Sequence, residues 1–470
     1  MKNRVYIKDL KDHVGQEAII AGWVDVRRDQ GKMVFFDMRD MTGKVQCVVL
    51  PKSTAMEIAG KIRPEWVLKI TGNVNKRPDK NINAGVLNGD IELEVTGIEI
   101  LNKAETPPFE INENTIAVNE DVRMKYKYLD LRTERMQKNI RMRHKAIKLI
   151  RDFLDKEGFI EVETPILTKS TPEGARDYVV PSRIWQGMFY ALPQAPQQYK
   201  QLLMTGGVEK YFQIAKCMRD EDTRGDRQPE FTQLDLEMSF VKREDVMELN
   251  ERLLVEIVKT LYPEKKIQEL PFPRLSYEEA VKKYDTDRPD LRKGKKNNDL
   301  LAFCWVVDFP FFEKTNKSDN PQAEGEWTFT HNPFSRPQEK NIADLLAKKN
   351  VANILTDQYD VVLNGSEIGG GSIRNHEPEA LRKVFEILGH KTEDIEKNFG
   401  HMLHAFRSGT PPHGGIAWGL DRILMILQDE PSIREVIAFP KTGEGRDLMM
   451  GAPTEISDKQ LKELGIKLSK

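Results

Sequence analysis

The stretch that decides the fold is YFQIAKCMRDEDTRGDRQPEFTQLDLEMSF, residues 211–240 of the 470-residue chain. Its first eight residues, Tyr211–Met218, are mostly apolar and predict a strand, and the charged residues that follow predict a loop. The chain then returns through Glu230–Phe240 as a second strand, so we expect a hairpin. Taken alone, the charged run Arg219–Asp222 is more typical of a solvated turn than of a functional site.

A second stretch, GGIAWGLDR at residues 414–422, predicts a glycine-rich strand that runs into an apolar helix. Glycine lets a ligand or another backbone approach closely, and Arg422 lies where the helix begins. An isolated arginine at a helix start most often forms a surface ion pair. The neighbouring glycines favour a binding role for Arg422 instead.

The composition excludes disordered, collagen-like and fibrous proteins and predicts a soluble chain of two or three domains, with 31% charged and 39% hydrophobic residues. The 72 Lys and Arg against 74 Asp and Glu give a net charge of -2, so a polyanionic partner would need a local basic surface. No apolar run is long enough to span a membrane and the N-terminus has no signal core, so we expect a cytoplasmic protein without a membrane partner. Three widely spaced cysteines are expected to be buried small hydrophobes.

The first hundred residues predict a small β-barrel. Residues 18–50 hold three apolar, β-branched runs, separated by charged turn clusters at Arg27–Lys32 and Arg39–Lys44. A short helical stretch and two more strands are expected at 53–61, 66–74 and 91–100. Five strands with a helix between the third and the fourth have the order of an OB-fold, whose open face commonly binds single-stranded nucleic acid.

The domain organisation follows from composition and periodicity. We expect an OB-fold domain at 1–104, a Pro-rich and polar linker at 105–132, and a larger domain at 133–470. The larger domain begins with one long helix from Thr133 to Gly158, whose basic residues in Arg132–Lys148 predict a solvated face, with proximity to tRNA as the alternative. The remaining helices and strands predict an α+β fold around a mainly antiparallel sheet.

Together, Thr164–Pro165, Met218–Glu221 and Gly419–Arg422 resemble the three motifs of class II aminoacyl-tRNA synthetases, in the same order. Longer segments are similar to aspartyl-tRNA synthetases of the bacterial type: LPQAPQQYKQLLM (192–204), RDEDTRGDRQPEFTQLDLEMSF (219–240), WVVDFPFFE (305–313), NGSEIGGGSIRNH (364–376) and GTPPHGGIAWGLDR (409–422). The resemblance covers nearly the whole chain. It implies a class II antiparallel-sheet catalytic domain with an N-terminal OB-fold anticodon-binding domain, and a homodimer with its interface at the helix before Phe159 and the strand ending at Pro165.

One departure from this family is a missing segment. Enzymes of the bacterial type usually carry an extra domain between the second and third motifs, and here only KGKKNNDLLAFC, from residue 293, stands in its place. We therefore expect that the insertion domain was deleted near 293–300.

The resemblance implies a site for ATP and for Mg²⁺. Forming an adenylate requires the substrate carboxylate to attack the α-phosphorus of ATP, so positioning and charge neutralisation matter more than a general base. Arg219 would contact the α-phosphate and the attacking carboxylate, Arg422 the γ-phosphate, and Phe231 would stack on adenine. Asp360 and Glu367 would hold Mg²⁺. The remaining ATP-binding residues implied are Glu221, Gln228, Gly419, Leu420 and Asp421.

The resemblance also implies an L-aspartate site. Lys200 and Arg374 would bind the side-chain carboxylate, because fixed cations suit that group. Arg219 would contact the α-carboxylate, and His331 would join the pocket when substrate binds. Two positions depart from the family: Ala195 stands where a serine is common, and Asn332 stands where a second histidine is common. The residues implied near the ammonium group are Glu173, Gln197 and Asp235.

On the barrel, Phe35 is expected on the open face, where an aromatic ring can stack on an anticodon base, while its neighbour Phe36 fills the core. Arg28 and Gln46 would add polar contacts to tRNA. Gln30 lies in the loop that in this family is near the third anticodon base; because its amide both donates and accepts, we expect acceptance of aspartate and asparagine tRNAs.

The sequence thus predicts an aspartate–tRNA ligase that uses ATP. The nearest alternative is a ligase for asparagine, or a synthetase-derived enzyme that forms asparagine, and the cations Lys200 and Arg374 disfavour it. The other alternative is a tRNA-binding protein with a vestigial catalytic domain. It is disfavoured by the presence of Arg219, Asp360, Glu367 and Arg422.

Overall fold

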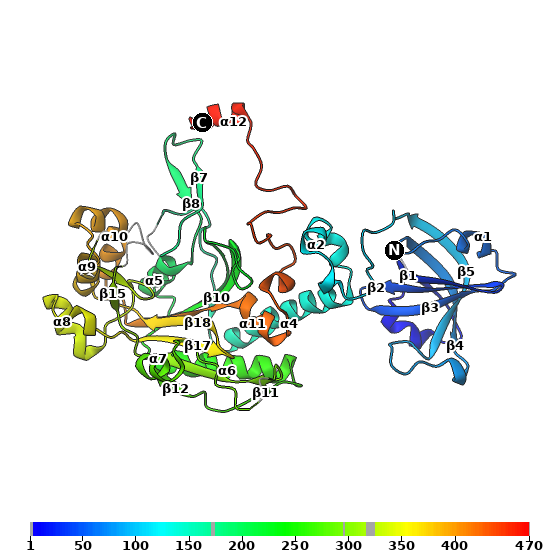
Figure 1. The fold of residues 1–470 in the computed structure, drawn as a ribbon, viewed down its shortest axis with the longest axis horizontal. Coiled ribbons are helices and arrows are strands. Elements are labelled where there is room, and N and C mark those ends of the chain that lie inside the picture. The colour runs from blue at the N-terminus through cyan, green and yellow to red at the C-terminus, as the bar shows by residue number, and fades with distance from the viewer. Residues whose placement is uncertain (1–2, 171–173, 295–296, 316–324, 470) are drawn as a thin grey trace. The chain divides into compact units, whose positions relative to one another are not determined.

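The computed structural model describes residues 3–170, 174–294, 297–315 and 325–469. Within them the chain divides into two compact units, 1–135 and 136–470 (Figure 1). The segment expected as a linker, 105–132, belongs by its contacts to the first unit, where Arg132 forms an ion pair of 2.9 Å with Glu65. None of the helices described is long and apolar enough to cross a membrane.

The first unit contains the expected barrel. The strands close in the order β1-β2-β3-β5-β4, and every neighbouring pair is antiparallel except β3 with β5. Their bounds are β1 (Glu17–Gln30), β2 (Met33–Asp40), β3 (Gly43–Val49), β4 (Val67–Lys76) and β5 (Ile91–Asn102). Alternate side chains fill the interior, as the buried residues Leu68, Ile70 and Val74 of β4 illustrate.

Short helices accompany the barrel. They are η1 (Ile7–His13), α1 (Met56–Ala59) and η2 (Asp79–Asn81), followed by η3 (Thr115–Ala117), α2 (Glu120–Lys125) and α3 (Lys127–Asp130). The strands reach further into the charged clusters than the sequence suggests, because β1 continues to Gln30 and β2 to Asp40. Charged side chains at the ends of these strands can stay in water while their backbones pair. The charged clusters therefore predicted turns that are longer than the turns in the structure.

The second unit is built on one large sheet with the order β12-β14-β17-β18-β19-β10-β9-β6. Its central strands pair antiparallel, and the outer pairs β12 with β14 and β6 with β9 are parallel. In that order the strands span Arg274–Ser276, Phe303–Val307, Gln358–Leu363, Ser366–Ile373, His413–Gly419, Glu230–Ser239, Lys210–Met218 and Ile160–Glu161. The hairpin expected at 211–240 is therefore the β9–β10 pair.

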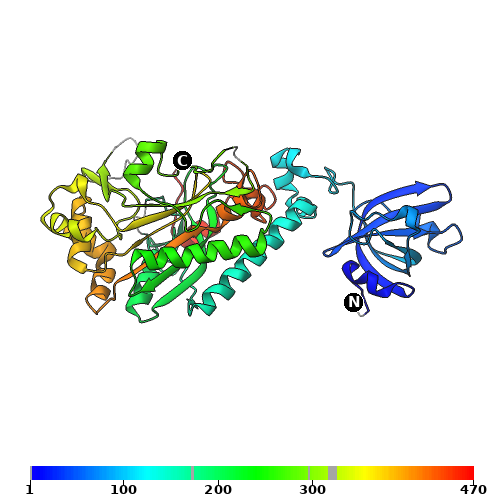
Figure 2. The ribbon, with the colours of Figure 1, turned by 90° about the horizontal axis from the view of Figure 1, so that it is seen from below.

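Three helices cover one face of this sheet. They are α4 (Glu134–Lys156), α6 (Arg243–Leu261) and α11 (Leu420–Leu427), and they share one hydrophobic cluster with the sheet. Figure 2 shows α6, in green, along this face with α4, in cyan, beside it. Because Leu234 and Leu236 of β10 point into the cluster, the alternate residues of that strand face the other way. Those residues line the site described below.

The other elements surround the sheet. The helices α8 (Ile342–Ala347), α9 (Pro378–Ile387) and α10 (Thr392–Phe406) form a second apolar cluster together with residues near Phe311 and Phe334. The smaller elements are α5 (Gln197–Thr205), α7 (Tyr277–Tyr284), α12 (Asp458–Leu464), η4 (Glu339–Asn341), η5 (Val351–Asn353) and η6 (Ile433–Val436), and the strand pairs β7 (Val179–Pro181) with β8 (Phe189–Ala191), β11 (Lys266–Ile267) with β13 (Leu300–Leu301), and β15 (Phe312–Lys314) with β16 (Trp327–Phe329).

Candidate active site

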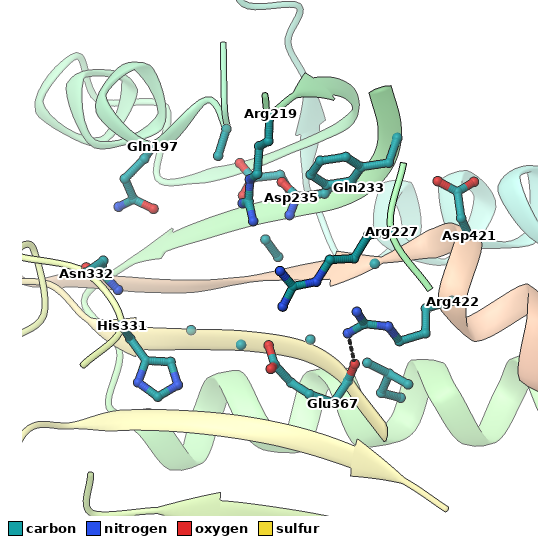
Figure 3. A pocket seen from close by; sticks show the side chains of 18 of the residues that line it. Gln197, Arg219, Arg227, Gln233, Asp235, His331, Asn332, Glu367, Asp421 and Arg422 are labelled. Atoms are coloured by element: carbon teal, nitrogen blue, oxygen red, sulfur yellow. Dashed lines mark hydrogen bonds between the residues drawn. The ribbon is translucent and has the colours of Figure 1, made fainter. Parts of the chain in front are cut away.

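A cavity of about 390 Å³ opens on the sheet face opposite the helices, over β10, β18 and β19 (Figure 3). Residues from widely separated stretches of sequence, between Ala195 and Ile433, meet there. Of the residues predicted for ATP and aspartate, those lining the cavity are Gln197, Lys200, Arg219, Glu221, Gln228, Phe231, Asp235, His331, Glu367, Arg374, Gly419, Asp421 and Arg422. Glu173 lies outside the described residues. The side chain of Leu420 packs in the hydrophobic cluster, which leaves only its backbone for a ligand.

Arginines gather at one end of the cavity. Figure 3 shows Arg219, Arg227 and Arg422 pointing into the same space; Arg219 directly follows β9, Arg227 lies in the hairpin loop and Arg422 belongs to α11. The guanidinium of Arg219 lies 5.1 Å from the centre of the Phe231 ring, and its buried Nε has no hydrogen-bond partner among the described residues. Arg422 donates to the backbone oxygen of Glu367 at 2.5 Å and to Asp226 at 3.3 Å. Such a group of fixed cations suits a polyphosphate.

At the other end, two cations share their charge with two buried carboxylates. The Nζ of Lys200 lies 2.6 Å from Asp235 and 3.3 Å from Glu237. Arg374 donates to both oxygens of Glu237, at 2.9 and 3.2 Å. Burial raises the pKa of Asp235, whereas for Glu237 the charges of Arg374 and Lys200 overcome the effect of burial and lower its pKa. The set is therefore electrically balanced before any ligand binds.

The donors of these two cations are not all used. Lys200 has three N–H bonds, of which Asp235 accepts one at 2.6 Å, while Glu237 forms an ion pair with the Nζ at 3.3 Å. Arg374 has five, of which Glu237, the hydroxyl of Ser372 and the backbone oxygen of Gly415 occupy four. At least one N–H therefore remains on each cation, which is enough for the two oxygens of one further carboxylate.

Close backbone packing under the cavity explains two of the glycines. A Cβ atom on Gly415 would lie 2.1 Å from the backbone oxygen of Leu236 and 2.2 Å from Glu237. A Cβ on Gly370 would lie 2.7 Å from the carboxylate of Asp360. Any side chain at either position would displace the buried carboxylates that order the site.

Asp360, one of the two predicted Mg²⁺ ligands, lies beneath the cavity. It accepts hydrogen bonds from Gln358 at 2.8 Å and pairs with His331 at 2.9 Å. Burial alone would lower the pKa of His331, but the charge and hydrogen bond of Asp360 raise it to about 9. Burial, followed by the nearby charge of Asp360, raises the pKa of Glu367. Two carboxylates that repel each other in this way suit a divalent cation.

No group of three or more His, Cys, Asp and Glu side chains in the described part of the chain could hold a metal ion by itself.

On the barrel, the predicted tRNA contacts share one face of the sheet. Phe35 lies opposite Arg28 on β1 and Val48 on β3, and the next residue on this face, Asp37, lies opposite Gln46. Phe36 is fully buried, while Phe35 is only partly covered. Gln30 is exposed at the end of β1, and Arg28 pairs with Asp37 at 3.0 Å.

Several polar side chains of the site are missing from the sequence-based set, among them Asp226, which pairs with Arg422. Gln233 and Glu237 stand two residues before and after Asp235 on β10, so the alternation of a strand would have placed them on the same face. Gln358 stands two residues before Asp360 on β17 in the same way. For Arg227, nothing in the sequence separates it from Arg224 in the same charged loop.

Two known domain families match the chain. Residues 18–101 match the OB-fold nucleic acid binding domain, and residues 119–443 match the tRNA synthetases class II (D, K and N).

The relatives that match over nearly the full length are named aspartate–tRNA ligases. The chain is 40% identical to the aspartate–tRNA(Asp/Asn) ligase of Natranaerobius thermophilus, with 100% of each chain covered, and 39% identical to the aspartate–tRNA ligase of Staphylococcus aureus, with 97% of each covered. The first alignment is 596 positions long and this chain has 470 residues, so 126 positions have no counterpart here.

Solved structures share the fold. Asparaginyl-tRNA synthetase from Pyrococcus horikoshii has a TM-score of 0.75 at 23% identity and covers 94% of this chain and 99% of its own. Aspartyl-tRNA synthetase from Entamoeba histolytica has a TM-score of 0.71 at 24% identity, covering 93% and 91%. Because the synthetase match spans more than half of the residues and the ligases align over nearly all of them, the chain belongs to the class II tRNA synthetases (D, K and N).

Proposed function

We propose that the protein attaches L-aspartate to tRNA at the expense of ATP, through an aspartyl-adenylate. The observation that carries this proposal is that Lys200 and Arg374 each keep at least one unused N–H, in a cavity whose other end holds Arg219 and Arg422. One end suits the side-chain carboxylate of aspartate and the other suits a triphosphate. The naming of the full-length relatives as aspartate–tRNA ligases supports the same substrates.

The first chemical step is an in-line displacement. The α-carboxylate of aspartate attacks the α-phosphorus of ATP, a new P–O bond forms, and the bond to the β-phosphate breaks to release pyrophosphate. Arg219 points into the cavity beside Phe231, where it can neutralise both the incoming carboxylate and the α-phosphate. Its contact with Phe231 fixes the guanidinium beside the ring on which adenine would stack.

The ammonium group of aspartate needs acceptors. Asp235 uses one oxygen for Lys200, and its buried Oδ2 has no partner among the described residues. Gln197 lies at the same end of the cavity and presents its amide oxygen (Figure 3). We assign both to the ammonium.

Asp360 and Glu367 fit Mg²⁺, because they are like-charged neighbours and Glu367 lines the cavity that also holds Arg422. When bound there, the ion would neutralise charge on the phosphates of ATP. A second step then transfers the aspartyl group to the terminal hydroxyl of tRNA and releases AMP.

We assign tRNA recognition to the barrel face of Arg28, Phe35 and Gln46, with Gln30 at its edge. The relatives named aspartate–tRNA(Asp/Asn) ligases favour acceptance of both tRNAs by this chain. The exposed amide of Gln30 supports the same reading, since it can meet either base at the third anticodon position. The cytoplasmic location remains a prediction from the sequence.

We further assign a homodimer. Ile160, in the strand predicted at its interface, is an exposed apolar side chain, as are Ile166 and Leu167 directly after that strand. Exposed apolar groups in one place are typical of a surface that another chain covers.

Aspartate-dependent exchange of pyrophosphate into ATP tests the reaction, with asparagine in a parallel assay. We expect exchange with aspartate at least a hundredfold above that with asparagine, because a neutral amide would put its NH₂ against the donors of Lys200 or Arg374. Equal or preferred use of asparagine would favour the asparagine ligase, and exchange with neither would favour a vestigial catalytic domain.

Aminoacylation of unmodified aspartate and asparagine tRNA transcripts tests the choice of tRNA. We expect similar rates with both. A preference above about a hundredfold for the aspartate tRNA, near 2.8 kcal/mol, would exclude relaxed specificity.

A further inference from the structure

The basic sequence of α4 predicts a solvated face. Arg143 departs from this prediction. Its side chain is 18% exposed, against 64% for Lys148 on the same helix. The prediction of a uniformly solvated basic face is therefore wrong at this residue. Helical periodicity places Arg143 near the boundary of the apolar face, where a long side chain can reach under a neighbouring element.

The guanidinium of Arg143 joins three segments. One nitrogen donates to the carboxylate of Asp421 at 2.5 Å and to the backbone oxygen of Val436 at 3.2 Å. The other donates to the hydroxyl of Thr232 at 2.9 Å. Asp421 in turn accepts the backbone N–H of Thr232 at 2.8 Å with its second oxygen. Arg143, Asp421 and Thr232 thus form a closed set, in which each member contacts the other two.

Each joined segment also supplies a wall of the cavity. Thr232 follows Phe231 on β10, Asp421 precedes Arg422 on α11, and Val436 belongs to η6, whose Ile433 lines the cavity. Figure 3 shows Asp421 and Arg422 leaving the start of α11 in different directions. All three walls belong to the end of the cavity with Phe231 and Arg422, and none of these contacts involves Lys200 or Arg374.

The preceding turn of α4 supports the same arrangement. Asn139 is buried and donates to the backbone oxygen of Glu435 at 3.0 Å and to the carboxylate of Glu430 at 2.7 Å. Asn139 and Arg143, on two successive turns of α4, therefore both donate hydrogen bonds to the backbone of η6.

We propose that Arg143 is a positioning residue for ATP: through Asp421 and Thr232 it fixes the relative placement of Phe231 and Arg422. The inference deepens the proposed function, since it takes ATP as the ligand of this end. A fixed spacing matters because adenine and the γ-phosphate lie at opposite ends of one molecule, and a misplaced group loses binding quickly. Arginine is required because a planar fork reaches several acceptors at once, which a lysine ammonium cannot do with the same geometry.

The test compares Arg143→Lys with Arg141→Lys, a matched change at an exposed arginine of the same helix. Calorimetry gives ATP affinity without any need for turnover, and pyrophosphate exchange gives the KM of ATP and of aspartate. We expect Arg143→Lys to weaken ATP binding and raise the KM of ATP more than tenfold. The KM of aspartate should change less than twofold, and Arg141→Lys should match the wild type.

A double-mutant cycle with Thr232→Val separates positioning from general loss of stability. If Arg143 acts through Thr232, the combined variant should bind ATP no more weakly than the worse single variant. Independent, additive losses, or equal increases in both KM values, would overturn the inference. If the wild type binds ATP but shows no exchange with aspartate, the proposed substrate fails while the ATP affinities of the variants still decide the role of Arg143.

Discussion

At the scale of single residues, the aspartate end of the cavity depends on how charge is shared. Lys200 and Arg374 are held by Asp235 and Glu237, so neither cation enters the ligand's space as an unpaired charge. A buried cation with no partner would be costly, and one whose donors were all used would offer a ligand no hydrogen bond. At least one spare N–H on each resolves both requirements.

Arg374→Lys should lower aspartate-dependent exchange by at least a hundredfold while ATP affinity stays within twofold. Lysine keeps the charge beside Glu237 but loses the planar fork, so the ligand carboxylate is left with a single directed contact. The smaller change is preferred to Arg374→Leu, which would leave Glu237 buried without its partner. Exchange kinetics with Arg382→Lys as a surface control measure the effect; exchange within tenfold of the wild type would refute this assignment.

His413 should make the fold sensitive to mild acid. Burial lowers its pKa to about 4, from an ordinary 6.5, because the ring is fully enclosed. The unfolded chain takes up this proton near pH 6.5 and the folded chain only near pH 4, so the free energy of unfolding falls as pH decreases between these values. The loss at pH 5 should be about 2 kcal/mol.

His413→Gln removes this titration. Between pH 7.5 and pH 5 its free energy of unfolding should therefore fall less than that of the wild type, by about the same 2 kcal/mol. Urea unfolding at a series of pH values measures this, with His404→Gln on the exposed side of α10 as control. If the free energies of unfolding of wild type and His413→Gln changed equally with pH, the ring would not be held neutral in the folded protein.

At the scale of elements, the strand β2 shows how alternation assigns neighbouring residues to different tasks. Phe36 points into the barrel and is fully buried, while Phe35 lies on the opposite face beside Arg28. Successive side chains of a strand point to opposite sides, so the two rings differ in role although they are adjacent in sequence.

Phe35→Ala and Phe36→Ala should therefore have different consequences. Phe36→Ala should destabilise the barrel by about 3–5 kcal/mol, as expected for a large side chain removed from a core. Phe35→Ala should leave stability nearly unchanged and weaken tRNA binding by about 1–3 kcal/mol, through loss of stacking on one base. Thermal unfolding, tRNA affinity and pyrophosphate exchange distinguish the two. A matching loss of exchange in Phe35→Ala would mean that it supports the fold.

At the scale of the whole molecule, the proposed dimer needs the apolar surface around Ile160 and Leu167, which the isolated chain leaves exposed. Ile160→Asp together with Leu167→Asp should convert the dimer to a monomer, because each buried carboxylate would lack a partner. Light scattering gives the molar mass directly. Ile82→Asp, at another exposed apolar residue, is the control and should remain dimeric.

Much of this organisation could be predicted from the sequence. The barrel strands, the helix α4 and the β9–β10 hairpin follow from periodicity and turn residues, and the class II family follows from motifs at 219–240 and 414–422; both are confirmed. These features depend on residues close together in the chain, which is why local patterns reveal them. The binding roles assigned to the residues for ATP, aspartate and Mg²⁺ remain predictions.

Only the tertiary structure decided how those residues are paired. That Glu237 holds Arg374, and that Arg143 reaches Asp421 and Thr232, depends on contacts across 137, 278 and 89 positions of sequence. A linear pattern shows which face of an element a side chain occupies, but not which element packs against that face. The chain by itself therefore determined the elements, the family and the set of reactive groups, while folding determined which charges neutralise one another and which donors are left for the substrate.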